Sequence, residues 1–238
     1  MRTIIKLTLK NAIRDPYLLF WSLLLPIAGT IGLGYFISSM NFIQRILTGM
    51  LCTSVIFYAY MTTVFTNIAQ RRRGVYTLLQ VTPLSLSKYI ISISLGWTAI
   101  ASVCSYAVLL AGMLVFKIPY SIGAVFRLLP IILLAAVGYI FLSFFISGFC
   151  KDEGRASMIN NIIIMPMLFC SDAFYPLQNA PQIIQYISKI NPFQYFVNGV
   201  RAALNGVFPN YMLSMVILIA VLFAALFLSV KTFKFSDV

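Results

Sequence analysis

Three consecutive arginines, Arg71, Arg72 and Arg73, stand between two long apolar runs of the 238-residue chain. Gly74 follows them, and Pro83 is expected to end any helix that forms next, because proline lacks an N–H and disfavours helix in the preceding residue. The apolar residues between are spaced as in one short amphipathic helix: Val75, Leu78 and Leu79, with Thr82 next on that face. The segment is either a docking helix on which a soluble partner pushes, or a solvated basic loop that only sets membrane orientation.

Polar side chains within or beside apolar runs form the second candidate group, because they are costly to bury in lipid and are therefore functional candidates. They are Asn67, Asn160, Asn161 and Asp172. Pro166 would free a backbone carbonyl near the two adjacent asparagines. These asparagines either hold helices together, worth about 0.6 kcal/mol on average, or contact a substrate or gate.

Several kinds of chemistry are excluded by missing residues. The chain has no histidine, which excludes His-based triads, His-metal sites and His proton relays. It has no G-x-x-x-x-G-K-[ST] motif, so it cannot bind ATP through a P-loop of its own. Asp172 is the only acidic residue near a span, which argues against a proton- or sodium-coupled carrier and against a membrane hydrolase. The four cysteines are scattered and are expected to be small buried hydrophobic residues.

Composition identifies the class of protein. Hydrophobic residues make up 61% of the chain and charged residues 9%, whereas soluble domains have roughly a quarter charged residues. The net charge of +12 could suggest nucleic acid. However, the basic residues lie at the ends of apolar runs, which positive-inside placement explains. We therefore predict an integral membrane protein with no nucleic-acid partner.

Six apolar runs predict six transmembrane helices, because lipid cannot hydrogen-bond a loose backbone and a span needs about 20 residues. The third run is long and the fifth is short. We expect an all-α fold with one transmembrane domain, residues 1–238. The runs are Tyr17–Ser39, Ile46–Ile68, Tyr89–Phe116, Leu128–Phe149, Ser157–Ser171 and Tyr211–Val230.

The distribution of cations predicts the orientation. With six spans and the N-terminus inside, 12 of the 17 lysines and arginines lie in inner segments. The outer segments hold the other five: Arg45, Lys117, Arg127, Lys189 and Arg201. This bias places both termini in the cytoplasm.

Residues 1–16 are predicted to form an amphipathic interfacial helix. Arg2, Lys6, Lys10 and Arg14 are four residues apart and so align along one helical stripe, next to an apolar stripe. Such a helix lies in the inner headgroup layer with its cations facing anionic lipid. A signal peptide is the alternative, but no A-x-A-like site follows the apolar run, so we expect the segment to be retained.

Two inner turns are distinguished by their charges. Residues 70–88 contain the arginine run and are the predicted cytoplasmic coupling segment. Lys151–Arg155 mixes both signs, and we expect solvated pairing within the turn, with a second docking contact as the alternative.

The segment between the fifth and sixth runs, residues 173–206, is too apolar for a free loop. It contains two short stretches of helical spacing, each too short to cross a bilayer. Asn191–Pro192 fits an N-cap followed by a proline at the first helical position. These stretches are expected to be re-entrant or interfacial helices over the outer mouth, where they act as a gate or only add stability.

The arginine segment resembles the loop after the second span of type-2 ABC transporter permeases. That loop reads Glu-Arg-Glu-Arg-Gly-Thr-Leu-Glu, then Thr-Pro-Leu-Ser. The matching residues are Arg71, Arg73, Gly74, Thr82, Pro83, Leu84 and Ser85. Gln70, Arg72 and Thr77 replace the family's acidic residues, which suggests an acidic patch on the partner. The resemblance implies a segment that contacts an ATP-hydrolysing subunit through Arg71, Arg72, Arg73, Gly74, Val75, Leu78, Leu79 and Pro83.

The outer segment resembles the family's second signature, Tyr-Pro-Leu, then Asn-Pro-Phe, then an arginine followed by a glycine. The corresponding residues are Tyr175–Leu177, Asn191–Phe193, Arg201 and Gly206. The resemblance therefore gives an outer gate composed of Tyr175, Pro176, Asn191, Pro192, Phe193 and Arg201.

The resemblance covers nearly the whole chain and implies the permease subunit of an ABC exporter in the bacterial plasma membrane. Two copies, or this chain with a related one, would form the path above two ATPase subunits, which would bind ATP and Mg²⁺. Many aromatic residues favour hydrophobic or amphipathic cargo such as drugs or antimicrobial peptides, although lipid-linked glycans remain open. The second hypothesis is an ATP-independent carrier, scramblase or assembly scaffold.

Overall fold

The chain is all-helical wherever its structure is described, which confirms the predicted fold class. The computed structural model describes residues 2–14, 16, 20–37, 39–82 and 86–232, and these ranges contain no strand. In chain order the elements are α1 Arg2–Ile13, η1 Phe20–Leu24, α3 Leu25–Phe36, α4 Met40–Ile56, η2 Phe57–Thr62, α5 Thr63–Arg72, α6 Val75–Gln80, α7 Leu86–Phe116, α8 Ile122–Phe149, α9 Glu153–Phe169, η3 Leu177–Asn179, α10 Gln182–Ile190, α11 Pro192–Asn205 and α12 Phe208–Thr232.

Four helices are long and apolar enough to cross a membrane. They are the continuous helix Met40–Arg72, which consists of α4, η2 and α5, then Lys88–Phe116, Ile122–Phe149 and Phe208–Thr232. At a rise of 1.5 Å per residue, the 33 residues of the first extend about 50 Å. That exceeds the roughly 30 Å hydrocarbon core of a bilayer.

The first and fifth predicted spans correspond to shorter helices. Phe20–Phe36 is apolar but has fewer than 18 residues in the described part of the chain. The fifth run overlaps α9, which has 17 residues, begins at Glu153 instead of Ser157 and ends at Phe169 instead of Ser171. Both helices fall at the lower limit of about 17 residues for a span. The count of six spans therefore stays a prediction.

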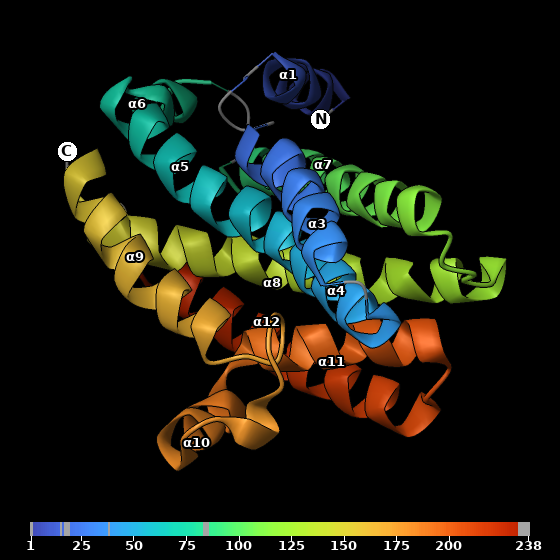
Figure 1. Cartoon of the computed structure of the whole chain (residues 1–238). Helices are drawn as coiled ribbons and strands as arrows, with labels where there is room; N and C mark the ends of the chain where they lie inside the picture. Colours follow the sequence, from blue (N-terminus) through green and yellow to red (C-terminus); the bar gives the residue numbers. More distant parts are fainter. Residues whose placement is uncertain (1, 15, 17–19, 38, 83–85, 233–238) are drawn as a thin grey trace.

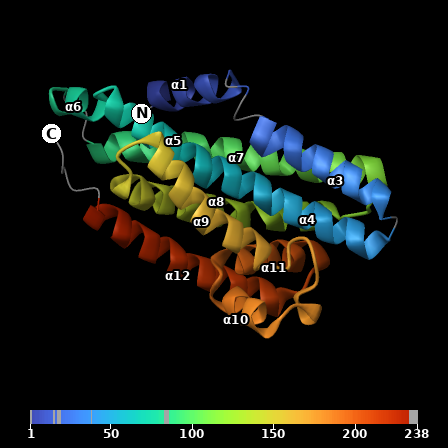
Figure 2. The same ribbon diagram turned by 60° about the vertical axis from the view of Figure 1, so that its left-hand side comes forward.

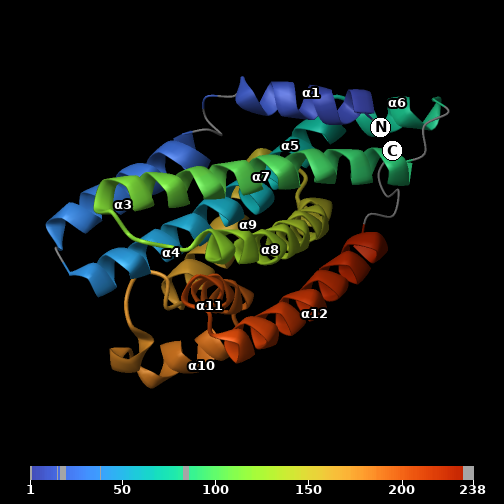
Figure 3. The same cartoon turned by 90° about the vertical axis from the view of Figure 1, so that its right-hand side faces the viewer.

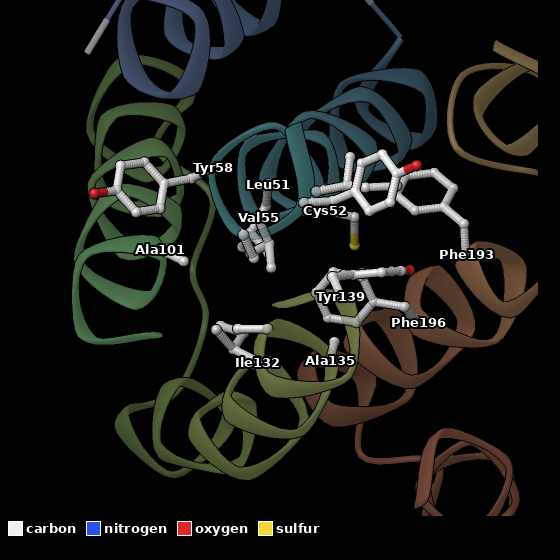
Figure 4. Packing of buried hydrophobic residues seen from close by; sticks show 14 of the residues in the cluster. Leu51, Cys52, Val55, Tyr58, Ala101, Ile132, Ala135, Tyr139, Phe193 and Phe196 are labelled. Atoms are coloured by element: carbon white, nitrogen blue, oxygen red, sulfur yellow. The ribbon is translucent and has the colours of Figure 1, made fainter. Parts of the chain in front are cut away.

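The long helix Met40–Arg72 forms the centre of the bundle, and most of its apolar window is buried. It packs against α3, α7, α8 and α11, which surround it (Figure 1). Figure 4 shows its side chains Cys52 and Val55 facing Tyr139 and Ile132 of α8. Tyr139 in turn meets Phe196 of α11 edge to face, with ring centroids 6.2 Å apart. The core therefore joins the middle of the chain to its outer helices.

The short elements gather at the two ends of the bundle. α1 and α6 lie at one end, near the described end of α12, whereas α10 lies at the opposite end (Figures 2 and 3). α1 rests on α7, where a Cβ on Gly96 would come within 2.9 Å of the Thr8 methyl group. Lys6 and Lys10 on α1 are exposed and Ala12 is buried. The predicted N-terminal amphipathic helix is thus present.

Two short helices, α10 and α11, lie between α9 and α12 as predicted, and their re-entrant or interfacial placement stays a prediction. The Asn191 side chain accepts a hydrogen bond from the N–H of Phe193, and Pro192 occupies the first helical turn. α11 ends at Gly206, whose φ of 74° is left-handed and suits a residue without a Cβ. Sequence therefore located the start of α11 correctly.

Gly49 provides a test of the packing between α4 and the segment after α9. A Cβ there would lie 2.8 Å from the carbonyl carbon of Ala173, and backbone cannot rotate away as a side chain can. We expect Gly49→Ala to lower the free energy of unfolding by about 1–3 kcal/mol, the usual cost of overpacking. Thermal unfolding in detergent, followed by fluorescence-detected size exclusion, measures the change.

Gly32→Ala is the matched control, because a Cβ added at this helical residue would have nothing within 4 Å of it. It should leave the melting temperature unchanged or raise it slightly, since alanine favours helix by about 1 kcal/mol over glycine. Equal destabilisation by both substitutions would show that α4 does not pack closely on Ala173.

Candidate coupling segment and outer charge cluster

The arginine run lies where the central helix ends and α6 begins. Arg71 and Arg72 form the last turn of α5, and the N–H of Arg73 still bonds to the Ala69 carbonyl at 3.1 Å. Gly74 has a φ of 67°, a left-handed conformation that lets the chain leave α5 and start α6 directly. The arginines are thus the end of a long helix, and not a separate loop.

Arg71 joins α5 to the end of α8. Its guanidinium donates hydrogen bonds to the carbonyl oxygens of Ser147 at 3.0 Å and Cys150 at 3.3 Å. The last carbonyls of a helix have no partners within that helix, and a cation there also interacts favourably with the helix dipole. Arg71 is half-buried, so it fixes the end of α5 onto the turn that leads to α9.

Arg72 adds a contact to the start of α9. Its guanidinium lies 3.2 Å from the Glu153 carboxylate, and both side chains are more than half exposed. Exposed pairs of this kind contribute about 0–1 kcal/mol. The Asp152 side chain caps α9 by accepting from the N–H of Arg155 at 2.8 Å. The turn predicted to pair only within itself therefore also contacts the arginine run, through Glu153.

α6 confirms the predicted short helix after Gly74, although it is shorter than the spacing suggested. It ends at Gln80 and leaves Thr82 beyond it. Leu78 is 63% exposed, and Val75 is half-buried. Pro83 lies outside the described residues, as does the side chain of Leu79. An exposed leucine beside a cationic helix end forms a surface suited to an acidic, partly apolar partner.

The Tyr76 phenol fixes α6 against α5 by donating to the Gln70 side-chain oxygen at 3.3 Å. Burial raises the pKa of Tyr76 above its ordinary value, so the hydroxyl stays protonated and can donate this bond.

At the opposite end, Asp172 lies between two arginines. Its carboxylate bonds to the guanidinium of Arg45 in α4, and at 2.7 Å to that of Arg201 in α11. All three side chains are less than 30% exposed. Burial lowers the pKa of Arg201, and the neighbouring Asp172 carboxylate opposes this shift. Two cations thus share one carboxylate, which leaves the cluster with a net positive charge.

Further hydrogen bonds complete this cluster. Arg201 also donates to the Thr48 hydroxyl at 3.1 Å, and the N–H of Asp172 donates to the Gln194 side-chain oxygen at 2.6 Å. The cluster therefore joins α4, the segment after α9, and α11. We call Arg45, Thr48, Asp172, Gln194 and Arg201 the outer charge cluster.

Asn191 adds a second junction beside the outer charge cluster. Its amide nitrogen donates to the carbonyl oxygens of Met167 at 2.7 Å and Cys170 at 3.0 Å, at the end of α9. Its amide oxygen caps α11. One side chain therefore satisfies the end of one helix and the start of the next. The Tyr175 hydroxyl reaches the Phe169 carbonyl of α9 as well.

The predicted gate residues differ in accessibility. Phe193 is fully buried in the core and Asn191 is 5% exposed, whereas Pro176 is exposed and Tyr175 and Pro192 are half-buried. Arg201 belongs to the outer charge cluster. These positions place the set together at one end of the bundle, and their role as a gate stays a prediction.

The candidate pathway residues have different surroundings within one copy of the chain, and their role in a pathway stays a prediction. Asn67 of α5 donates to the Ser147 hydroxyl of α8 at 3.4 Å, a contact between helices. Asn160 is fully buried, and neither of its amide atoms has a hydrogen-bond partner among the described residues. Asn161, next to it, is exposed on the other side of α9. Asp172 belongs to the outer charge cluster, beyond the end of α9.

Sequence reasoning missed Arg45, Thr48 and Gln194 as site residues. Arg45 was visible only as an outer cation, and Asp172 as an isolated acid. The two are 127 residues apart in sequence. The available signal was the lone carboxylate of Asp172 at an outer helix end, because a poorly exposed carboxylate needs a cation to pair with it. No spacing rule relates such distant positions.

The long apolar helices define a helical integral membrane protein. A family model described as ABC-2 type transporter matches residues 1–205. The chain belongs to this family of transporter membrane components.

Three curated relatives show low identity to the chain. Nodulation protein J of Sinorhizobium fredii is 23% identical over 192 residues, which are 75% of this chain and 71% of that protein. The probable multidrug ABC transporter permease YbhR of Escherichia coli K12 is 25% identical over 131 residues, 54% of this chain. The putative transport permease ycf38 of Porphyra purpurea is 26% identical over 132 residues, 55% of this chain. The matched regions cover 35% of YbhR and 45% of ycf38.

Removing the carboxylate of Asp172 should destabilise the outer end of the bundle. In Asp172→Asn, two partly buried guanidinium groups lose their only anionic partner among the described residues. We expect the free energy of unfolding to fall by about 1–3 kcal/mol, the cost of unpaired buried polar groups. Asp152→Asn should change it by about 0.5 kcal/mol or less, because that residue is exposed and asparagine caps a helix equally well. Thermal unfolding of both variants in detergent measures the difference, and similar values would contradict a stabilising role for the cluster.

Proposed function

We propose that this chain is the permease subunit of an ATP-driven exporter, with six spans and both termini in the cytoplasm. Two copies, or this chain with a related one, form the pathway in a bacterial plasma membrane. An ATPase subunit docks on each copy at Arg71, Arg72, Arg73, Gly74, Val75, Leu78, Leu79 and Pro83. The observation that carries the proposal is the hydrogen bonding of the arginine run to the turn between α8 and α9.

These contacts offer a route for force. A push on α6 reaches Arg71 and Arg72, which hold the end of α8 and the start of α9. α9 then runs toward the end of the bundle where Asn191 and Asp172 hold it (Figure 1). A packed helix held at both ends transmits displacement instead of absorbing it. Movement of the arginine run and α6 would thus shift the position of the outer helices α10 and α11.

In this proposal the partner subunit, and not this chain, binds and hydrolyses ATP. The chain has no P-loop motif, so ATP and Mg²⁺ would bind to the ATPase subunits. The partner's docking surface would carry acidic groups facing the arginine run. The alternative, an ATP-independent carrier, predicts transport in liposomes that contain this chain alone.

Hydrophobic or amphipathic cargo, such as a drug or an antimicrobial peptide, fits the apolar and aromatic character of the helices. The name of the relative YbhR, a probable multidrug permease, agrees with this choice. Efflux assays with a panel of compounds in a sensitised host test it, and a phenotype confined to polar glycans would exclude it.

Arg71→Gln should uncouple the ATPase from the permease. The variant removes two charge-assisted hydrogen bonds to the end of α8, and each such bond is worth about 1.5–3 kcal/mol. We expect cargo-stimulated ATP hydrolysis to fall about tenfold, the factor that corresponds to about 1.4 kcal/mol. The measurement uses the chain co-purified with the ATPase encoded beside it and reconstituted in liposomes.

Arg155→Gln is the control, because it removes an equal charge at the start of α9 and leaves the α5–α8 contact unchanged. Replacing Gly74–Leu79 with a Gly/Ser linker gives a second test, since it removes α6 without changing the arginines. Unchanged stimulation in both the Arg71→Gln and linker variants would exclude a coupling role for this segment.

A further inference from the structure

A cavity lies within a single copy of the chain, beside the arginine run. Its volume is about 980 Å³, at the upper end of the roughly 300–1,000 Å³ typical of ligand pockets. α1, η1, η2, α5 and α7 contribute to its walls. Both π-helical segments, η1 and η2, therefore border it, and such wide helical turns are frequent at functional sites.

One wall of this cavity changes from apolar to cationic along a single helix face. Its lining residues form adjacent pairs that repeat every four residues along η2 and α5 and end at Arg73, just after α5: Phe57, Tyr58, Met61, Thr62, Phe65, Thr66, Ala69, Gln70 and Arg73. From Phe57 to Arg73 this wall extends about 24 Å at 1.5 Å per residue. This wall begins with aromatic residues of η2 and continues along α5, which leads to α6 at the end of the bundle beside α1 (Figure 3).

Two tryptophans extend the aromatic part of the cavity. Trp21 of η1 packs near Phe57, with ring centroids 6.0 Å apart, and Trp97 of α7 packs near Phe144 at 6.2 Å. They are the only two tryptophans in the chain. Both therefore report on this one cavity.

The mouth of the cavity is positively charged. Arg14, just after α1, and Arg73 both line it and are exposed, and neither has an ion-pair partner among the described residues. Glu153 also lines it, but its carboxylate is already paired with Arg72 at 3.2 Å. Two uncompensated guanidiniums at one end and aromatic rings at the other match a molecule with an anionic head and an apolar tail.

We propose that this cavity binds one anionic phospholipid of the inner leaflet, with its phosphate at Arg14 and Arg73 and an acyl chain along the aromatic wall. The proposal rests on the orientation proposed above, in which α1 lies in the inner headgroup layer. The aromatic part of the wall, from Phe57 to Phe65, extends about 12 Å, comparable to half of the roughly 30 Å hydrocarbon core. A bound lipid would join α1 to the arginine run, so the lipid composition would influence the coupling segment.

Quenching of tryptophan fluorescence by brominated lipid tests this site directly. In Trp21→Phe the remaining tryptophan is Trp97, which is only 5% exposed. The full-length variant is reconstituted in phosphatidylcholine vesicles that contain a small, fixed fraction of brominated phosphatidylglycerol or of brominated phosphatidylcholine. We expect about tenfold or greater preference for the anionic lipid at Trp97, as two cations facing one headgroup would give.

Matched double variants separate the cavity from general surface charge. Arg14→Gln/Arg73→Gln should abolish the preference, because it removes both guanidiniums at the mouth. Lys151→Gln/Arg155→Gln removes the same charge from an exposed turn outside the cavity lining and should leave it intact. Equal quenching by both lipids, or equal loss of preference in both double variants, would overturn the proposal. The assay needs no ATPase and so does not depend on the proposed coupling.

Discussion

The sharing of Asp172 between Arg45 and Arg201 is the interaction on which the outer end of the bundle depends. Charges this poorly exposed are costly unless they are paired and hydrogen-bonded. The pairing therefore fixes α4 and α11 relative to the segment that follows α9. Because Arg201 also bonds to Thr48, and Gln194 to the backbone of Asp172, any movement of α11 must rearrange several contacts together.

The other end of α9 is held by a different kind of contact. Arg71 satisfies the carbonyls at the end of α8, and Arg72 pairs with Glu153 at the start of α9. α9 thus connects two polar clusters at opposite ends of an otherwise apolar bundle. The buried side chain of Asn160 has no partner in the described structure, so α9 also carries a polar group that a second chain or water could satisfy. If a force acts on the arginine run, a helix fixed at both ends, as α9 is, can carry the displacement to the opposite end of the bundle.

Local patterns predicted the helices well, whereas distant contacts could not be read from sequence. Asn191–Pro192 located the start of α11, and the spacing after Gly74 located α6, because caps and helix faces depend on neighbouring residues. The same spacing extended α6 to Thr82, beyond its end. The second predicted run ended at Ile68, but α5 continues to Arg72, so two of the arginines complete this helix. Pairing of Asp172 with Arg45 depends on tertiary packing across 127 residues, and no periodicity encodes it. The roles of the coupling and gate residues remain predictions.

The central claim is that the arginine run and the outer helices α10 and α11 face opposite sides of the membrane. Single cysteines at Val81 and Ile190, both more than 80% exposed, test it in a background without the four native cysteines. Each variant is labelled with a membrane-impermeant maleimide in right-side-out and inverted vesicles. We expect labelling of Val81→Cys only in inverted vesicles and of Ile190→Cys only in right-side-out vesicles. Labelling of Val81→Cys from outside the cell, or of both positions from one side, would contradict the claim.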